Sequence, residues 1–335
     1  MDPRMPLHDI ADYVRRVEAM GFDGLHVAET VHDALAVSLL AAEHTERIII
    51  RTSVALAFVR SPTLTAYAAW DLARFSGGRF QLGLGTQIRQ NIEERMGMPW
   101  SEPVTRMRDY VGALTTLFAA FREGGTPDHQ GDVYRVTRLQ PYFNPGPDPD
   151  TTPPMIWLGG VNAAMCQLAG EVAGGFVSHP TNSNPRYLDE ICLPNLLLGL
   201  ERSGRERSAL EVVVGPAMVS GPTDADVAAE REHQRRMVAF LYSTPAYART
   251  LELYGWADLG ADLRSLIRDE RWDDLSAVVH DEVLDTLLPT GRYDELGAVL
   301  LDRYAGRADG IVLGPQPDPA NDEHVGRLVV ELQRA

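Results

Sequence analysis

The feature that most constrains the fold is a regular alternation of helical and strand-like segments that begins at residue 9. Segments with apolar residues three and four positions apart alternate with short apolar runs. The first predicted helices cover residues 9–20, 34–44 and 62–75, and the first predicted strands cover 25–29, 48–59 and 79–84. Such alternation predicts a parallel sheet with right-handed crossover helices, which either closes into a barrel or carries helices on both faces.

The alternation continues and gives seven predicted strands in all. The further strands are predicted at residues 155–158, 176–178, 210–219 and 310–313, and the further long helices at 103–122, 163–172, 187–200, 224–242, 293–304 and 323–333. Three stretches are expected to be insertions, namely 89–103, 124–152 (with a hairpin) and 244–290 (helical). A (β/α)8 barrel needs eight strands, and residues 1–7, with two prolines and no β-branched residue, make a poor strand. No linker divides the chain, so we expect a single domain over residues 1–335.

The predicted strand 48–59 is interrupted by polar residues. Its apolar run breaks at Arg51-Thr52-Ser53 and resumes at Val54, and the whole run is longer than an ordinary strand of ~5–6 residues. We therefore expect a bulge or kink at residues 52–54, of the kind that re-aims side chains near active sites. A plain core strand in which Ser53 is hydrogen-bonded locally is the alternative. Arg60 follows at the carboxyl end, and Ser61-Pro62 can cap the next helix.

Charge and composition exclude several classes of protein. The net charge of −16 argues against nucleic-acid binding. All 31 basic residues are arginines, which excludes a Schiff-base lysine and a P-loop. Cys166 and Cys192 form no metal-binding pattern, and the N-terminus lacks the pattern of a signal peptide, so we expect a cytoplasmic protein that spans no membrane.

Candidate functional residues follow the predicted strands, because ligands of parallel α/β sheets bind at the carboxyl ends of the strands. Glu29, His32 and Asp33 follow the first strand and could act as acid–base groups, although an N-cap by Asp33 with solvated neighbours is equally compatible. The third strand ends in a Gly-Leu-Gly sequence followed by Thr86 and Gln87, which is a weak dinucleotide fingerprint but allows close approach of the backbone to a ring.

A glycine-rich turn after residue 158 is the best candidate for an anion site. Gly159, Gly160 and Val161 precede a predicted helix whose N-terminal N–H groups and dipole favour a phosphate. His179 follows the next strand and could line the same mouth, although a lone histidine is more often structural. The histidines show no spacing of a metallohydrolase, and no GxSxG motif indicates a serine nucleophile.

Several of these segments resemble the bacterial luciferase-like superfamily, and within it the coenzyme F420-dependent oxidoreductases. The matching pieces are residues 21–33, 41–48, 60–63, 76–85, 157–160 and 168–175. Ser-Gly-Gly-Arg-Phe followed by Leu-Gly-Leu-Gly in 76–85 is the most specific of them. The resemblance implies a TIM (β/α)8-type barrel with insertions, whose first strand is missing from this chain, and a homodimer.

The resemblance also implies a cofactor, F420 or alternatively FMN, at the carboxyl mouth of the barrel. It places a non-prolyl cis peptide at Ser53-Val54, with Ala55, behind the ring. It further implies ring contacts by Thr86 and Gln87, a nearby acid at Glu29, and a phosphate-binding turn at Gly159-Gly160. The lysine that holds the phosphate tail in some members has no equivalent here, and Arg186 is the candidate substitute.

The sequence therefore supports three hypotheses for the function. The first is an F420-dependent oxidoreductase that transfers a hydride between the deazaflavin and a small organic substrate, with His32 and Glu29 handling the accompanying proton and Arg60 or Arg186 binding substrate or an anion. The second is a reduced-FMN-dependent monooxygenase. The third is a non-catalytic flavin-binding protein. No metal is expected.

Overall fold

The computed structural model describes residues 1–335, which form two compact units. Unit 1 comprises Met1–Gly159, Gln167–Phe176 and Gly199–Leu210, and unit 2 comprises Gly160–Cys166, Val177–Leu198 and Glu211–Ala335. The main sheet has the strand order β1-β2-β4-β7-β8-β9-β12, with β3 paired to β4. The pairs β1–β2, β2–β4, β3–β4, β4–β7 and β9–β12 run parallel, which confirms the predicted α/β fold.

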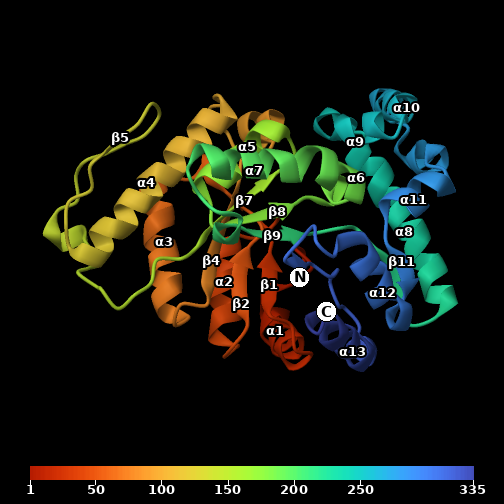
Figure 1. Cartoon of the computed structure of the whole chain (residues 1–335), viewed down its shortest axis with the longest axis horizontal. Helices are drawn as coiled ribbons and strands as arrows, with labels where there is room; N and C mark the ends of the chain where they lie inside the picture. Colours follow the sequence, from red (N-terminus) through yellow and green to blue (C-terminus); the bar gives the residue numbers. More distant parts are fainter. The chain divides into compact units, whose positions relative to one another are not determined.

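Unit 1 contains the first strands of the main sheet and the helices between them (Figure 1). Its strands are β1 (Gly24–Val27), β2 (Ile49–Thr52), β3 (Ala55–Leu56), β4 (Phe80–Gly85) and, up to Gly159, β7 (Ile156–Gly160). Its helices are α1 (Ile10–Ala19), α2 (Ala34–Glu43), α3 (Pro62–Phe75) and α4 (Pro103–Glu123), with the larger part of α5 (Ala163–Val172). A π-helix covers Asn91–Arg95, and β5 (His129–Gln130) pairs antiparallel with β6 (Arg135–Val136) in the predicted hairpin.

Unit 2 contains the last strands of the sheet and most of the C-terminal helices. Strand β8 (Gly175–Ser178) is shared, because its first two residues belong to unit 1. The other strands are β9 (Glu211–Val214) and β12 (Gly310–Ile311) of the main sheet, and β10 (Val219–Gly221) and β11 (Thr290–Arg292), which pair parallel in a sheet of their own. The helices are α6 (Pro185–Tyr187), α7 (Leu193–Arg202, whose end belongs to unit 1), α8 (Asp224–Tyr242), α9 (Ala248–Leu253), α10 (Ala257–Arg268), α11 (Asp281–Leu287), α12 (Tyr293–Tyr304) and α13 (Asp322–Gln333). The predicted helical insertion thus contains α9, α10 and α11.

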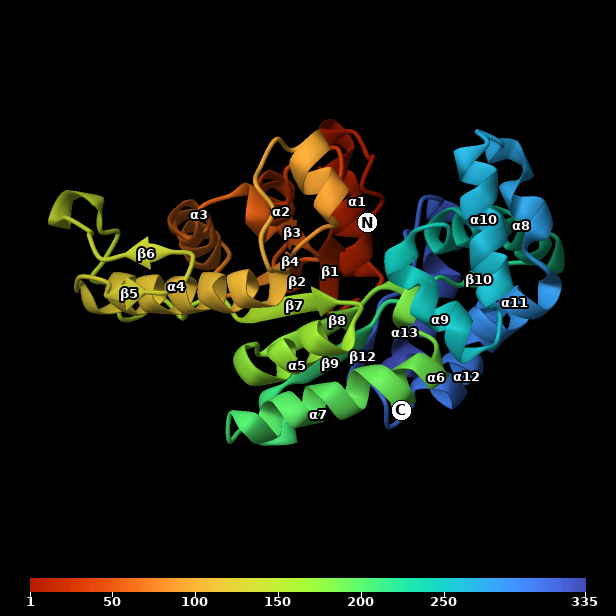
Figure 2. The same ribbon diagram turned by 90° about the horizontal axis from the view of Figure 1, so that it is seen from above.

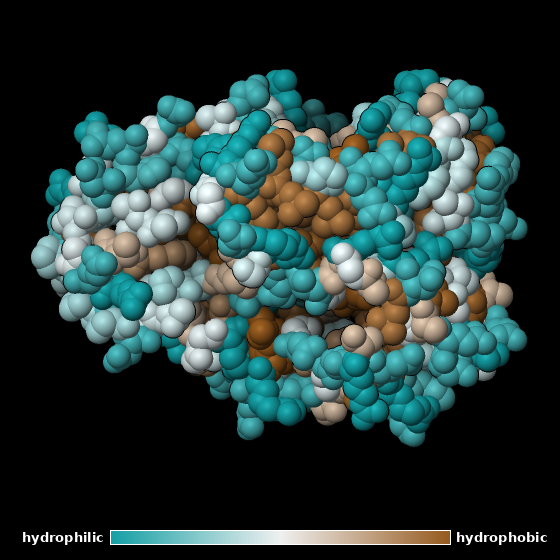
Figure 3. Space-filling model, viewed as in Figure 1, coloured by the Kyte–Doolittle hydropathy of each residue, from teal (hydrophilic) through white to brown (hydrophobic).

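Each unit has its own apolar core. In unit 1, α3 packs on α4 through Trp70, which stacks on Phe118 (6.1 Å between ring centroids) and meets Phe121 edge-on (5.6 Å). In unit 2, the core includes the buried residues Val238 of α8, Leu263 of α10 and Leu284 of α11. Figure 2 shows these three helices close together. The face of the molecule shown in Figure 3 is mostly hydrophilic, with smaller apolar areas between. No helix combines the length and apolarity that crossing a bilayer requires.

Two charged side chains fix the start of β2. Glu18 accepts hydrogen bonds from the backbone N–H groups of Glu46, Arg47 and Ile48 at 2.7–3.1 Å. Arg79 donates to the backbone oxygens of Ala42, Thr45, Ile48 and Ser76 at 3.0–3.2 Å. The arginine of the Ser-Gly-Gly-Arg-Phe sequence therefore holds together the backbone segments that precede β2 and β4, which is a structural role.

Two predicted strands were wrong in their extent. The predicted strand 48–59 is divided into β2 and β3 at Ser53-Val54, as its polar break indicated, but its last three residues form a 3-10 turn, Ala57–Val59. The predicted strand 210–219 is two separate strands, β9 and β10. Gly215-Pro216 lies between them, and proline lacks the N–H that a continuing strand would use.

Candidate active site

The kink between β2 and β3 is the most unusual backbone feature of unit 1. The peptide bond between Ser53 and Val54 is cis, which confirms the expectation from the resemblance. The Ser53 N–H donates to the Val27 carbonyl at 2.7 Å, so the kink is tied to the end of β1. On the other side β3 pairs with β4, with Leu56 opposite Gly85. The carboxyl ends of β1, β3 and β4 therefore meet around this kink.

Two glycines of β4 allow the kink to lie against the neighbouring strand. A Cβ atom on Gly83 would come within 1.9 Å of the Thr52 carbonyl oxygen. A Cβ atom on Gly85 would come within 2.4 Å of the Val54 Cγ2 atom. The Thr52 hydroxyl donates to the Gly83 carbonyl (2.8 Å) and accepts from the Gly83 N–H (2.9 Å), which holds the two strands at this short separation.

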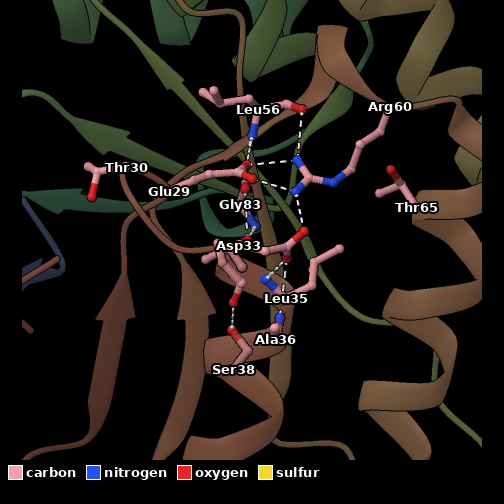
Figure 4. Close-up of polar contacts among 12 residues, drawn as sticks. Glu29, Thr30, Asp33, Leu35, Ala36, Ser38, Leu56, Arg60, Thr65 and Gly83 are labelled. Atoms are coloured by element: carbon pink, nitrogen blue, oxygen red, sulfur yellow. Dashed lines mark hydrogen bonds and ion pairs between the residues drawn. The ribbon is translucent and has the colours of Figure 1, made fainter. Parts of the chain in front are cut away.

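Glu29, Arg60 and Asp33 form a hydrogen-bonded group beside β3 (Figure 4). Glu29 Oε2 accepts from the Leu56 N–H at 2.7 Å and from Arg60 Nη1 at 2.8 Å, while its Oε1 contacts Arg60 Nη2. Arg60 Nη2 also donates to Asp33 Oδ2 at 2.6 Å. The other oxygen of Asp33 caps α2 by accepting from the N–H groups of Leu35 and Ala36. The predicted N-cap by Asp33 is thus confirmed.

Ion pairs hold the side chains of Glu29 and Asp33 against that of Arg60. The side chains of Glu29 and Arg60 are only 9% and 18% exposed, whereas that of Asp33 is 50% exposed. The hydrogen bond to Glu29 raises the pKa of Arg60 above its ordinary value, with Asp33 contributing less. Burial acts to raise the pKa of Asp33, but the hydrogen bonds and charge of Arg60 outweigh it, so that this pKa is lowered. The roles predicted for Glu29 in proton transfer and for Arg60 in anion binding stay predictions.

The other residues predicted in unit 1 lie at the same strand ends. His32 follows Glu29, is half-buried and has no hydrogen bond or ion pair with another residue, so its ring nitrogens are available to a ligand. Ala55 is the first residue of β3. Thr86 and Gln87 follow β4, and Gln87 adopts a left-handed conformation (φ 61°) with its Oε1 accepting from the Ile88 N–H. Their predicted contacts with a cofactor ring stay predictions.

The predicted anion-binding turn lies in unit 2 from Gly160 onward. The Gly160 carbonyl accepts from Asn182 Nδ2 at 3.0 Å, and the Val161 carbonyl accepts from the Tyr187 hydroxyl at 2.5 Å. Asn162 caps α5 by accepting from the Met165 N–H. The backbone N–H groups of Val161 and Asn162 lie at the start of α5. The donors needed for an anion are therefore present, and Asn182 and Tyr187, which no local sequence signal distinguished, fix the turn.

His179 and Arg186 are both engaged within unit 2. Burial lowers the pKa of His179 to about 4, so the ring is neutral near pH 7. Its Nδ1 accepts from the Thr181 N–H, which places the ring proton on Nε2, and the ring stacks on Tyr247 at 4.8 Å. Arg186 pairs with Glu190 at 2.7 Å and lies over the Tyr254 ring. Their predicted roles in binding a cofactor or an anion stay predictions.

A partly buried polar row in unit 1 was not identified from the sequence. Arg51 Nε donates to Gln81 at 2.8 Å, Arg51 Nη1 lies 3.0 Å from His26 Nε2, and the guanidinium stacks on Trp157. Burial and the charge of Arg51 lower the pKa of His26 well below its ordinary value. The register of β1, β2 and β4 places His26, Arg51 and Gln81 side by side. The only sequence signal was Arg51 itself, in an otherwise apolar run.

Comparison with known proteins agrees with this fold. Residues 1–310 match the model of a family described as luciferase-like monooxygenase. An uncharacterised protein of Mycobacterium tuberculosis is 41% identical over 302 residues, which cover 90% of this chain and 88% of that one. A 5,10-methylenetetrahydromethanopterin reductase of Archaeoglobus fulgidus is 28% identical over 306 residues, which cover 88% of this chain and 85% of that one. The coenzyme F420-dependent tetrahydromethanopterin reductase of Methanopyrus kandleri superposes with a TM-score of 0.82 at 18% identity, over 99% of this chain and 96% of that one.

Proposed function

Because the chain belongs to the luciferase-like monooxygenase family, we propose that this oxidoreductase uses F420 and transfers a hydride between the deazaflavin and a small organic substrate. The curated relative from Archaeoglobus fulgidus is named as a reductase of a methylene-pterin, which supports reduction of a small organic molecule. Bound F420 would supply the hydride chemistry, and the protein would supply binding, orientation and a proton path. A reduced-FMN monooxygenase is the second candidate, which the family description favours.

The observation that carries the proposal is the meeting of three strand ends at Leu56. Its N–H is bound by Glu29 of the loop after β1, and its backbone pairs with Gly85, just before Thr86 and Gln87. A parallel sheet presents its ligands at such converging ends. We propose that the ring of the cofactor lies against Ser53, Val54 and Ala55 there, and that Thr86 and Gln87 contact it.

The donor set after β7 fits the phosphate that F420 and FMN both carry. The N–H groups of Val161 and Asn162, at the start of α5, favour an anion through hydrogen bonds and the helix dipole. We propose that the turn from Gly159 to Asn162 binds this phosphate, with the Nε2–H of the neutral His179 as a further donor. Since the sequence has no lysine, these backbone groups and the arginines, Arg186 among them, are the available partners.

Titration of the purified protein with each cofactor tests the proposed function. We expect the fluorescence of F420 to change on binding with a micromolar or lower Kd, and FMN to bind at least tenfold more weakly. Tighter binding of FMN, with oxygen consumption by the reduced form, would favour the monooxygenase, and binding of neither would contradict both candidates.

We propose His32 as the group that handles the proton, and a His32→Ala variant with unchanged turnover would remove it from this role.

Replacing Tyr187 with phenylalanine should weaken the binding of phosphate-bearing flavins selectively. The variant loses only the hydroxyl that holds the Val161 carbonyl, so the neighbouring N–H groups are no longer fixed. A lost hydrogen bond of about 1 kcal/mol corresponds to a roughly fivefold rise in the Kd of FMN. The Kd of riboflavin, which lacks the phosphate, should stay within twofold.

The matched control is Tyr67→Phe, which removes another tyrosine hydroxyl from a backbone carbonyl, that of Phe143. It should leave both dissociation constants unchanged. Equal losses for FMN and riboflavin in Tyr187→Phe would contradict a phosphate site at this turn.

A further inference from the structure

Leu56 is held by side chains on both of its backbone groups. Its N–H donates to Glu29 Oε2 at 2.7 Å, and its carbonyl accepts from Arg60 Nη1 at 3.3 Å (Figure 4). Glu29 and Arg60 also bind each other through both guanidinium nitrogens. Because β3 is only two residues long, the sheet gives Leu56 few hydrogen bonds of its own. The Glu29–Arg60 pair therefore supplies much of the anchoring of this segment.

Arg60 in turn is oriented by a second carboxylate. Asp33 accepts from Arg60 Nη2 at 2.6 Å while its other oxygen caps α2. A planar guanidinium can bind two carboxylates and a carbonyl at once, which a lysine ammonium on its flexible stem does less well. The loop after β1, strand β3 and the start of α2 are thus joined through one side chain.

The same contacts argue against proton exchange by Glu29 and against anion binding by Arg60. Glu29 uses both of its oxygens to accept three hydrogen bonds, two of them from a cation. The two bonds from the guanidinium are charge-assisted, which makes them stronger than ordinary hydrogen bonds, so both oxygens of the carboxylate are committed to holding Arg60 and Leu56. Arg60 faces two carboxylates, so an incoming anion would have to compete with both.

We propose that Glu29 and Arg60 are positioning residues, which fix Leu56 and through it the segment 53–55, rather than groups that exchange protons or bind an anionic substrate. The proposal rests on the proposed function in one respect, because segment 53–55 is the part that would face the cofactor ring. The anchoring itself requires no cofactor. Asp33 supports it by orienting Arg60.

The test is amide hydrogen exchange across residues 54–60 in the cofactor-free protein, together with titration by F420. Arg60→Gln and Glu29→Ala should each speed exchange of this segment at least tenfold and raise the Kd of F420 at least tenfold. The exchange rate and the F420 Kd of Glu29→Gln should lie between those of these variants and those of the unaltered protein. The amide oxygen of glutamine still accepts from the Leu56 N–H but carries no charge. The double variant Glu29→Ala/Arg60→Gln should exchange no faster and bind F420 no more weakly than either single variant. It leaves neither Glu29 nor Arg60 as a buried charge without its partner.

Arg108→Gln is the matched control. It breaks another arginine–glutamate pair of unit 1, with Glu171, whose side chain is 12% exposed against 9% for Glu29. Exchange of residues 54–60 should be unchanged in this variant. If Arg60→Gln does not fold, Arg60→Lys keeps the charge without the planar fork and should still speed exchange.

Unaltered exchange and an unaltered F420 Kd in Glu29→Gln and Arg60→Gln would overturn the proposal. So would additive effects in the double variant, because they would mean that the two side chains act independently. Faster exchange in a protein that binds neither F420 nor FMN would support the anchoring and contradict the proposed function instead.

Discussion

Replacing Gly83 with alanine is expected to lower the midpoint of thermal unfolding by about 6 °C or more. The new Cβ would lie 1.9 Å from the Thr52 carbonyl oxygen and 3.0 Å from the Thr52 carbonyl carbon, both of which are backbone atoms. Backbone in the middle of a paired sheet cannot move away as a flexible side chain can. Overpacking of this kind costs about 3 kcal/mol, the upper end of the usual range, and each kcal/mol corresponds to roughly 2 °C in a domain of this size.

Calorimetry or the change in near-ultraviolet circular dichroism on heating measures this effect. Gly125→Ala is the control, because Gly125 is exposed and a Cβ there would meet no atom within 4 Å. Its unfolding midpoint should stay within about 2 °C of the unaltered protein. An equally small change in Gly83→Ala would contradict the close approach of β4 to the Thr52 carbonyl.

Replacing Gly85 with alanine is expected to weaken cofactor binding at least tenfold while the protein still folds. Here the new Cβ meets the Val54 side chain, at 2.4 Å from Cγ2 and 3.3 Å from Cβ. Val54 has a branched side chain with few rotamers, so the residue itself must shift. Under the proposed function Val54 backs the cofactor ring, and a tenfold rise in the F420 Kd corresponds to about 1.4 kcal/mol.

The double variant Gly85→Ala/Val54→Ala tests this reason directly. Removing the two γ-methyl groups of Val54 relieves the contact, so the Kd of F420 should return at least halfway, on a logarithmic scale, to its unaltered value. The unfolding midpoint of Gly85→Ala should fall less than that of Gly83→Ala, because a side chain yields more easily than backbone. Cofactor binding that is unaffected in Gly85→Ala would mean that the ring does not lie against Val54.

The sequence predicted those parts of the fold whose causes are local. Helix α3 was predicted with its observed bounds, because Ser61 caps its start, with its hydroxyl accepting from the Leu64 N–H, and Pro62 can occupy only the first turn. Helices α5, α8 and α12 were also predicted with their observed bounds. The kink at Ser53-Val54 was predicted because polar residues interrupt an apolar run.

The partners of the charged residues could not be predicted in this way. Glu29, Asp33 and Arg60 were each selected from the sequence, but as separate candidates for separate roles. Their contact joins residues 27 and 31 positions apart, and it depends on the lateral order of β1, β2 and β4. Arg51 and Trp157 are a second such case, because the cation–π contact between them joins residues 106 positions apart, with α3, β4 and α4 between them.

Local sequence patterns were thus sufficient to predict most of the elements, the parallel sheet and the strand ends at which a site can form. Caps, breaks and apolar periodicity act within a turn or two of chain, so the residues nearby are sufficient to specify them. The pairing of each carboxylate with its guanidinium, and the backbone group that the pair holds, follow instead from the folded arrangement of the strands. Those contacts depend on strand register and on the close approach of β4 at its glycines, and both are set by the packing of segments distant in the chain.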